Sequence, residues 1–299
     1  MNGIDISKHN NKGNPIDWAK VDASGIDFAL IRAGYGNNIS QKDPKFEENM
    51  QGSLAHKLHV GAYWFSYAIS PEDTLKEAEV FKKVLAPYRG RIDFPVAFDY
   101  EYDSITYSKK QGVNPTNALI DSIARAFMDS MKADGWFVNL YTNIDFIRSG
   151  RFSSDTCLKY DIWLADYSGG PDYPCGIQQT GSTGVVPGIS GSVDLDMSFK
   201  DYPTIIRAGG YNGYPQPQII DFKSDTTTDI RLKPGQAYQL KVTAKNAPVV
   251  TVGTTGVAAL LPRYRQGEDS YFYLVGIGKP GAAAGIYVNG VKQFVIYAA

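Results

Sequence analysis

Two carboxylic acids near the middle of the chain are the residues best suited to chemistry. The segment 94–101 has the pattern of a short apolar strand that ends in Asp99 and Glu101. Side chains at positions i and i+2 of a strand share one face about 7 Å apart, given a rise of roughly 3.3 Å per residue. Such a pair suits glycoside hydrolysis, in which one carboxyl protonates the leaving oxygen and an ionised one stabilises the positive charge that develops on the sugar. The alternative is a pair of surface carboxylates in a turn.

Length, composition and charge exclude several classes of protein. The 299 residues are 43% hydrophobic and 20% charged, which predicts a globular chain with one large domain or two unequal ones. A net charge of −1 does not support binding to nucleic acid or to anionic lipid. The N-terminus lacks the features of a signal peptide, and no run approaches ~18 unbroken apolar residues. We therefore expect synthesis in the cytoplasm and no membrane insertion.

The sequence predicts neither a metal nor a cofactor. Cys157 and Cys175 are too few for a disulfide framework and lack a metal-ligand spacing, so we expect free thiols. His9, His56 and His59 form no ligand pair. The segment 34–36 (Gly-Tyr-Gly) lacks the third glycine or the Lys-Ser/Thr that a nucleotide-binding loop requires, and is expected to form a turn.

Apolar runs typical of buried strands alternate with helical patterns over the first two hundred residues. The strand candidates are 28–31, 60–65, 94–101, 137–141 and 162–165. One helix is predicted to begin after Ser70, with an apolar face made of Leu75, Ala78, Phe81 and Leu85. Another is predicted to begin at Asn114 and to end at Gly135. Repeated strand-helix-strand order implies parallel strands, so we predict a (β/α) barrel.

Polar residues follow several of these strands. Asp99 and Glu101 end one strand, and the corresponding ends of three others carry Arg32, Tyr141, Asn143, Asp166 and Tyr167. Because functional groups of such barrels lie where the strands end, these side chains are expected to converge at one mouth.

A series of short motifs runs through the first 200 residues. It comprises 3–9 (GIDISKH), 16–18 (IDW), 25–28, 31–36, 43–46 (DPKF), 61–67 (GAYWFSY), 99–101 (DYE) and 184–196 (GVVPGISGSVDLD). In this order the motifs resemble those of glycoside hydrolase family 25 lysozymes. The resemblance implies an irregular (β/α) TIM-like barrel and a muramidase that cleaves the β-1,4 bond after N-acetylmuramic acid in peptidoglycan. Many members are phage endolysins or bacterial cell-wall enzymes.

The resemblance also implies roles for individual acids. Glu101 matches the general acid and Asp99 its carboxylate partner, while Asp5 and Asp194 match two further acids. Repulsion among these carboxylates and partial burial would keep Glu101 protonated near neutral pH. The chain has Asp194-Leu195-Asp196 where the family commonly has Asp-x-Asn, so Asp196 is an alternative to Asp194. Catalysis is either substrate-assisted, with the 2-acetamido group as nucleophile, or follows the two-carboxylate scheme.

Candidate substrate contacts come from the same strand ends. They are Tyr63, Tyr141, Arg32, Asn143 and Asp166. Most other large aromatics are expected in the core, and Trp163 belongs either to the barrel wall or to the cleft. Where the family commonly has Trp-Gln-Tyr, this chain has Gln178-Gln179-Thr180, which is expected to remove two rings from near the cleft.

The pattern changes after residue 205. We predict a catalytic barrel over 1–205, a linker rich in glycine and proline over 206–217, and a small antiparallel, immunoglobulin-like β-sandwich over 218–299. Its strand candidates are 219–222, 228–232, 238–243, 249–252, 271–275, 285–288 and 291–296, with a hairpin turn at Asn289-Gly290. We expect the sandwich to bind the cell wall, with dimerisation or spacing as the alternative.

Three functions are consistent with the sequence. The first is a peptidoglycan muramidase of the phage endolysin type that acts on the bacterial cell wall after release. The second is a barrel glycosidase for chitin-like polymers, which is disfavoured because the longer acidic run of such enzymes is missing. The third is a non-catalytic wall-binding protein, which a missing acid would have indicated.

Overall fold

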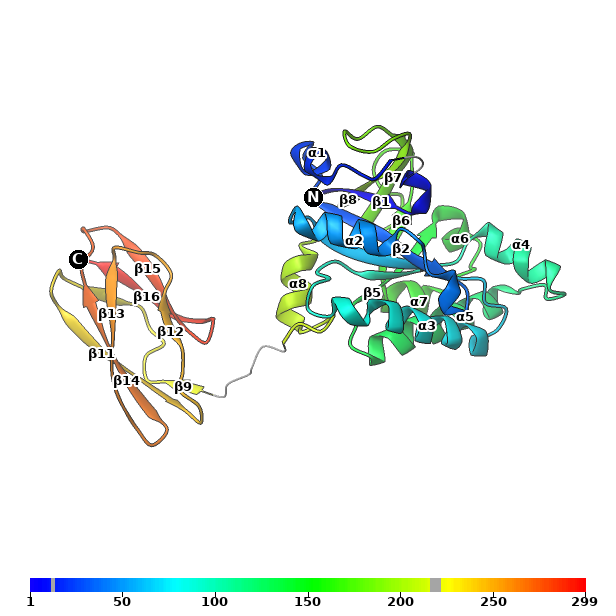
Figure 1. Ribbon diagram of the computed structural model, residues 1–299. Helices are drawn as coiled ribbons and strands as arrows, with labels where there is room; N and C mark the ends of the chain where they lie inside the picture. Colours follow the sequence, from blue (N-terminus) through cyan, green and yellow to red (C-terminus); the bar gives the residue numbers. More distant parts are fainter. Residues whose placement is uncertain (12–13, 216–221) are drawn as a thin grey trace. The chain divides into compact units, whose positions relative to one another are not determined.

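The chain forms two compact units, Met1–Pro217 and Gln218–Ala299. The computed structural model describes residues 1–11, 14–215 and 222–299 (Figure 1). Each unit has its own buried apolar cluster. None of the helices in these ranges combines the length and the apolar character that a membrane span requires.

The first unit is a mixed α/β structure built on a closed barrel, in which the described strands β1 to β8 are neighbours in chain order. They are β1 (Asn2–Ile6), β2 (Phe28–Tyr35), β3 (His59–Phe65), β4 (Val96–Asp99), β5 (Val138–Asn143), β6 (Asp161–Ala165), β7 (Ile177–Gly184) and β8 (Val193–Ser198). Strands β1 to β7 are parallel, as the strand-helix alternation predicts. Strand β8 is antiparallel to both of its neighbours, which makes the barrel irregular.

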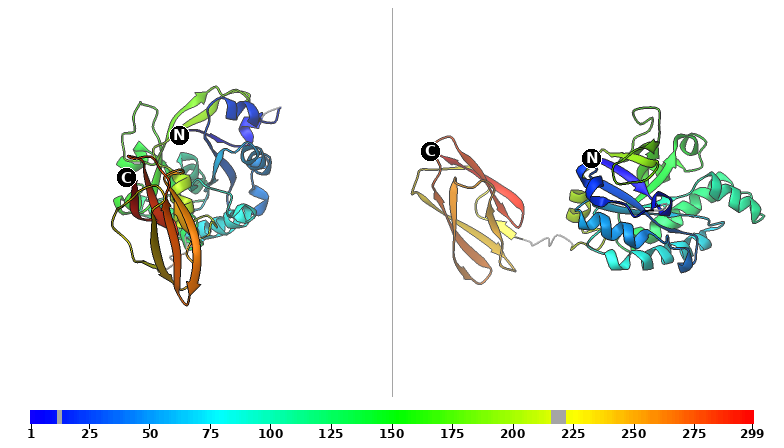
Figure 2. Two further views of the ribbon diagram at one scale, coloured as in Figure 1. Left: turned by 90° about the vertical axis from the view of Figure 1, so that its left-hand side faces the viewer. Right: turned by 45° about the horizontal axis from the view of Figure 1, so that its top comes forward.

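Most helices of this unit lie around the outside of the barrel, and one projects away from it (Figures 1 and 2). They are α1 (Trp18–Ala23), α2 (Phe46–Ala55), α3 (Pro71–Leu85), α4 (Tyr102–Lys110), α5 (Asn117–Ala133), α6 (Ile144–Arg148), α7 (Ser154–Lys159) and α8 (Tyr202–Gly209). Short 3₁₀ turns lie at Lys8–Asn11, Ile39–Gln41 and Ala86–Tyr88. The predicted strands and helices are therefore present, but β1, β7 and β8 carry mixed polar sequences and were not among the strand candidates.

The barrel strands alternate between two cores. In β4, Val96 and Phe98 belong to the apolar cluster between strands and helices, whereas Ala97 belongs to a cluster inside the barrel. The inner cluster contains Phe28, Leu30, Phe94, Trp163 and Tyr202. Because side chains two residues apart share a face, Asp99 follows Ala97 on the inner side and lies at the carboxyl end of the barrel.

Two helices differ in detail from their sequence pattern. Helix α3 begins after the N-cap Ser70 as predicted, but Leu75 is 43% exposed and the buried face runs through Thr74, Ala78 and Phe81. Helix α5 begins at Asn117 rather than at Asn114, because the side chain of Thr116 accepts a hydrogen bond from the amide of Leu119 and caps the helix. The pattern identified the helices, and the caps and packing fixed their phase.

Part of the expected linker over 206–217 packs on the first unit. Helix α8 continues to Gly209, and Asn212 is fully buried. The Asn212 amide donates to the carbonyls of Ile92 (3.1 Å) and Phe94 (3.0 Å), and its oxygen accepts from the amide of Phe137 at 2.8 Å. Glycine and proline content indicated a linker here, but these bonds connect Asn212 to the segments that lead into β4 and β5. Residues 216–217 lie outside the described ranges.

We expect Asn212→Ala to destabilise the first unit by roughly 2–4 kcal/mol. Three buried backbone groups lose their partner, at about 1–3 kcal/mol for each group left unsatisfied, with partial relaxation. Tryptophan fluorescence during urea unfolding of the full chain measures this unit alone, because all four tryptophans precede residue 164. Asn117→Ala, which removes one exposed bond to the Ser149 carbonyl, is the matched control and is expected to cost less than 1 kcal/mol. An equally small effect of Asn212→Ala would contradict the assignment of this segment to the barrel unit.

The second unit consists of two four-stranded sheets within the described residues. One has the order β10-β16-β15-β12 and the other β13-β14-β11-β9. The strands are β9 (Phe222–Ser224), β10 (Ile230–Leu232), β11 (Ala237–Ala244), β12 (Val250–Val252), β13 (Ala258–Gln266), β14 (Asp269–Gly276), β15 (Ala283–Val288) and β16 (Val291–Ala298). The predicted hairpin at Asn289-Gly290 is present between β15 and β16, with positive φ at both turn residues.

Three points of the second unit differ from the sequence pattern or extend beyond it. Strand β13 was not predicted, because its residues are largely exposed and lack clear alternation. Strands β10 and β16 pair in parallel, whereas an antiparallel arrangement was expected. The strand predicted over 219–222 lies outside the described residues, apart from Phe222 at the start of β9.

Candidate active site

The structure brings the predicted acids together at the carboxyl end of the barrel. Strand β1 supplies Asp5, β4 ends at Asp99, and Glu101 immediately precedes α4. Strand β8 supplies Asp194, which is the register partner of Asp5 in the antiparallel pair of β1 and β8. Directly paired residues carry their side chains about 4.5–5.5 Å apart on one face. Asp196 follows Asp194 on the same face of β8.

Asp99 and Asp5 occupy the buried part of this cluster, at 4% and 5% exposure. Burial raises the pKa of Asp99 well above its usual range, and the neighbouring Glu101 and Asp5 raise it further. The pKa of Asp5 is raised well above its usual range by burial and by the charges of Asp196 and Asp194. One oxygen of Asp99, Oδ1, is buried without a hydrogen-bond partner among the described residues. This oxygen is a free acceptor for a group of a bound substrate.

Glu101 is more accessible than Asp99 because it lies at the start of a helix. Its amide donates to the side chain of Ser104 at 3.0 Å, which fixes the backbone where the strand turns into α4. Burial raises the pKa of the Glu101 carboxyl, and the charges of Asp103 and Asp194 add to this effect. A hydrogen bond with Asp99 opposes it. A half-buried carboxyl with a raised pKa is suited to donate a proton near neutral pH.

The geometry separates the two aspartates that the sequence left as alternatives. Asp196 is 4% exposed, and its Oδ1 accepts a hydrogen bond from the indole of Trp163 at 2.8 Å. Burial raises the pKa of Asp196 to about 8. Asp194 is only half-buried, so its carboxyl faces the mouth. Trp163 therefore lies inside the barrel, where it supports Asp196.

Gln179 connects the acids to the aromatic residues, and the sequence analysis did not name it as a site residue. Its Nε2 donates to Asp5 Oδ2 at 2.6 Å, and its Oε1 accepts from the hydroxyls of Tyr141 (3.0 Å) and Tyr167 (2.7 Å). The sequence feature that could have indicated Gln179 is its position, because it matches the central glutamine of the Trp-Gln-Tyr segment that the family commonly has. Gln178 points the other way and donates to the carbonyls of Asp166 and Gly169, so its side chain supports a loop rather than the cleft.

We expect Gln179→Ala to lower kcat roughly tenfold, equivalent to about 1.4 kcal/mol and typical of one hydrogen bond to a charged group. The Gln179 bond lowers the pKa of Asp5, so its loss should also move the acid limb of the pH–activity profile to higher pH. Gln178→Ala is the control, because it removes two loop bonds on the opposite side of β7. We expect Gln178→Ala to lower thermal stability without shifting the acid limb, and a shift in both variants would argue against the specific role of Gln179.

The predicted substrate contacts divide into two groups. Arg32 and Tyr63 are register partners on β2 and β3. Arg32 pairs with Asp43 through Nε (2.9 Å) and Nη2 (2.8 Å), and its charge opposes the rise in the pKa of Asp99. The Tyr63 ring contacts Trp163 edge-on at 5.7 Å between centroids. Tyr63, Tyr141 and Arg32 thus adjoin the acids.

Asn143 and Asp166 have local roles in the structure. Asn143 is the N-cap of α6, and its side chain accepts from the amide of Phe146 at 3.0 Å. The Asp166 carboxylate accepts hydrogen bonds from the hydroxyl and amide of Ser168 and from the amide of Asp172. These hydrogen bonds lower the pKa of Asp166, that of the Ser168 hydroxyl most. Both residues line the mouth, but their hydrogen-bonding groups hold α6 and the 166–172 loop.

Two hollows flank the acids. One, of about 420 Å³, is lined by Glu101, Tyr141, Tyr167 and the loops after β5 and β6. The other, of about 370 Å³, is lined by Arg32, Tyr35, Phe65 and Tyr67. Within the described ranges, no group of three or more histidine, cysteine, aspartate or glutamate residues is arranged to hold a metal ion. The cleft therefore offers carboxyl, hydroxyl and aromatic groups to a ligand.

An α/β barrel whose mouth gathers carboxyl groups with raised pKa values has the architecture of a glycoside hydrolase. The comparison with family models agrees and is more specific. Residues 4–188 match the model of glycosyl hydrolases family 25, and the chain belongs to this family.

Similar proteins include lysozymes and autolysins. The chain is 30% identical over 202 residues to the autolytic lysozyme of Clostridium acetobutylicum, covering 66% of this chain and 55% of that protein. The modular autolysin LytC of Streptococcus pneumoniae, solved with a synthetic peptidoglycan ligand, aligns at 25% identity with a TM-score of 0.56, over 65% of this chain and 46% of that one. A lysozyme of Streptomyces coelicolor shares the fold at 22% identity and a TM-score of 0.57, over 72% and 98%. The chain thus spans about half the length of the clostridial relative.

Proposed function

We propose that the chain is a peptidoglycan hydrolase that cleaves the β-1,4 bond between N-acetylmuramic acid and N-acetylglucosamine. The observation that carries the proposal is the convergence of Asp5, Asp99, Glu101 and Asp194 at one barrel mouth. Membership of glycosyl hydrolases family 25 supports it, as does the clostridial relative, which is named an autolytic lysozyme. We infer in addition that the barrel is an irregular TIM-like one.

In the proposed reaction Glu101 is the general acid. Its proton passes to the glycosidic oxygen as the bond from that oxygen to the sugar carbon breaks, and positive charge develops on the ring. Burial raises the pKa of Glu101 and of its hydrogen-bonded neighbour Asp99, so this pair retains the proton that the step requires. The carboxylate that results then accepts a proton from water in the second step.

The role of Asp99 follows from its free acceptor atom. We infer that Asp99 Oδ1, buried without a partner among the described residues, accepts the N–H of the substrate's 2-acetamido group. Oriented in this way, the acetamido oxygen forms a bond to the sugar carbon and closes a second, five-membered ring. Water later attacks the sugar carbon and opens this second ring. The hydrogen bond between Asp99 and Glu101 leaves little room for the water of an inverting mechanism, in which the carboxyls are about 6.5–9.5 Å apart. Asp5 and Asp194 complete the group of acids at this mouth.

Fragments released from purified Gram-positive peptidoglycan test this function directly. Mass spectrometry after reduction identifies the sugar at the new reducing end. Reducing N-acetylmuramic acid is the expected result, whereas reducing N-acetylglucosamine would assign the cut to the other bond. Binding to several walls without any release would support a non-catalytic wall-binding protein instead.

We further propose that the second unit is an immunoglobulin-like sandwich that binds the cell wall, and that the protein acts on that wall as a released endolysin or autolysin. Its two four-stranded sheets share a core formed by Leu240, Val242, Leu274, Ile286 and Ile296, which supports independent folding. A wall-bound module raises the local concentration of the tethered barrel. The segment 218–299 is expected to pellet with purified walls, and its failure to do so, with a folded circular dichroism spectrum, would contradict the binding role.

A further inference from the structure

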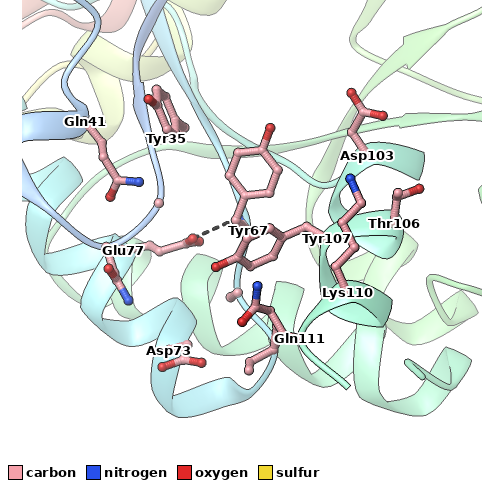
Figure 3. Close-up of a pocket in the computed structure, with 14 residues that line it drawn as sticks. Tyr35, Gln41, Tyr67, Asp73, Glu77, Asp103, Thr106, Tyr107, Lys110 and Gln111 are labelled. Atoms are coloured by element: carbon pink, nitrogen blue, oxygen red, sulfur yellow. Dashed lines mark hydrogen bonds between the residues drawn. The ribbon is translucent and has the colours of Figure 1, made fainter. Parts of the chain in front are cut away.

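A cavity of about 450 Å³ lies beside the cleft and has no role in the reaction described above. It is formed by the segment after β2, the segment between β3 and α3, and helix α4 (Figure 3). Tyr35, Tyr67 and Asp103 line both this cavity and the hollow that reaches Arg32. The cavity therefore adjoins the hollow lined by Arg32.

The inner part of the cavity holds a carboxyl group that lacks a full set of partners. Glu77 is 1% exposed, and its Oε1 accepts from the amide of Tyr67 at 2.9 Å (Figure 3). Its Oε2 is buried without a hydrogen-bond partner among the described residues. Burial raises the pKa of Glu77 to about 8, against the interactions with Ser66 and Tyr67. A buried polar atom without a partner is costly, and a bound donor would remove that cost.

The rest of the cavity suits a cation. Tyr67 contacts Tyr35 and Tyr107, with ring centroids 5.9 and 5.0 Å apart. Tyrosine rings attract ammonium groups through their negative faces. Asp73 and Asp103 add carboxylates, and the charge of Asp73 also raises the pKa of Glu77. Lys110 is the cation of the lining, and Figure 3 shows its amino group directed toward Asp103 and away from Glu77.

We propose that this cavity binds the ammonium group of the substrate's peptide branch, held by the tyrosine rings and the free oxygen of Glu77. The inference rests on the proposed function, because the peptide branches of peptidoglycan supply primary amines next to the glycan. A neutral sugar would use the rings but would not be attracted by the negative charges of Asp73, which also pairs with Lys76, and Asp103. An ammonium group uses both the rings and the carboxylates, and Tyr35 and Tyr67 join this cavity to the hollow lined by Arg32, on the side of the barrel where the substrate would lie.

Binding of an ammonium group is coupled to the protonation of Glu77. Glu77 interacts with Ser66 and the amide of Tyr67, with Asp73 on its own helix, and with Tyr100, whose pKa is raised by burial and by the charge of Glu77. Tyr35, Asp103, Tyr107 and Lys110 line the same cavity, and the amino group of Lys110 is directed away from Glu77. A guest cation favours the ionised form and lowers the pKa of Glu77. Near pH 7, where the free protein holds Glu77 protonated, binding is therefore accompanied by proton release.

Calorimetric titration of the full chain tests the proposal without requiring cleavage. The probe is a soluble disaccharide tripeptide that ends in lysine with a free ε-amine, and its partner is the same molecule with that amine acetylated. We expect the acetylated probe to bind at least about tenfold more weakly, the range of a desolvated cation–π contact. The free amine should release a proton, measured as a difference in binding enthalpy between phosphate and Tris buffers, and Glu77→Gln should abolish that release.

Tyr107 gives a test that does not depend on a buried residue, because its side chain is 39% exposed. Tyr107→Ala is expected to remove the preference for the free amine. Tyr107→Phe retains the aromatic ring and is expected to retain that preference. Equal affinity for both probes in the wild-type chain would overturn the inference, even if the protein cleaves walls. Preference for the free amine in a protein that releases no fragments would leave the inference standing and contradict the proposed function.

Discussion

Replacing Glu101 by glutamine is expected to lower kcat on peptidoglycan by about 10²-fold or more, the lower range for loss of a general acid. The glutamine keeps the size and the position at the start of α4 but has no proton to give to the leaving oxygen. Turbidity loss of purified walls and the rate of release of reducing ends both measure the change. Asp145→Asn is the matched control, because Asp145 lines the hollow beside Glu101 but pairs with Arg151. We expect it to stay within about threefold of the wild type, and near-normal turnover of Glu101→Gln would contradict the assignment.

The pH profile provides a second readout for the same residue. Glu101 must be protonated to act as an acid, and its pKa is raised by burial and by Asp103 and Asp194. Activity of the wild-type chain is therefore expected to fall as the pH rises through this raised pKa. The residual activity of Glu101→Gln should lack that alkaline limb, since glutamine does not titrate. If the alkaline limb is unchanged in Glu101→Gln, that limb reports the titration of a group other than Glu101.

The sequence indicated the strand-helix order of the barrel and part of the candidate site. Asp99 and Glu101 were predicted from strand spacing alone, because an apolar run followed by two acids at i and i+2 fixes a shared face. Asp5 and Asp194 came only from the family resemblance. Their pairing depends on the reversed strand β8, and no local pattern announces that a mixed polar segment closes a barrel antiparallel.

The details that the sequence did not indicate share one physical cause, which is tertiary context. Asn143 and Asp166 lie at the mouth as strand ends predict, but their hydrogen bonds cap α6 and hold the 166–172 loop. Gln179 was overlooked because a glutamine in a strand has no chemistry of its own until Asp5, Tyr141 and Tyr167 surround it. Such roles depend on which side chains are in contact in the folded protein. The periodicity of a strand predicts only the face of the sheet on which each side chain lies.

Asp99→Asn is expected to lower kcat by about 10²–10³-fold, the usual cost of removing one preorganised electrostatic group. The amide keeps the shape of the carboxyl but cannot ionise as positive charge develops on the sugar, and it presents a donor or a weaker acceptor to the acetamido N–H. Wall-cleavage kinetics measure this loss, with KM expected to change less than kcat because the charge acts chiefly in the transition state.

The same variant is expected to be more thermally stable than the wild type at pH 7. The pKa of Asp99 is raised in the folded protein, so the folded state binds more protons than the unfolded state, and stability falls as the pH rises from the unfolded towards the folded pKa. Asparagine does not ionise, so the variant avoids the free-energy cost of a buried carboxyl whose pKa is raised on folding. Asp43→Asn gives the opposite sign, because Asp43 is equally buried but accepts from Arg32 at 2.8 and 2.9 Å, and loss of this charged pair should lower the melting midpoint. A midpoint for Asp99→Asn that falls as for Asp43→Asn would show that Asp99 supports the fold, whereas loss of activity with gain of stability is the mark of a carboxyl retained for catalysis.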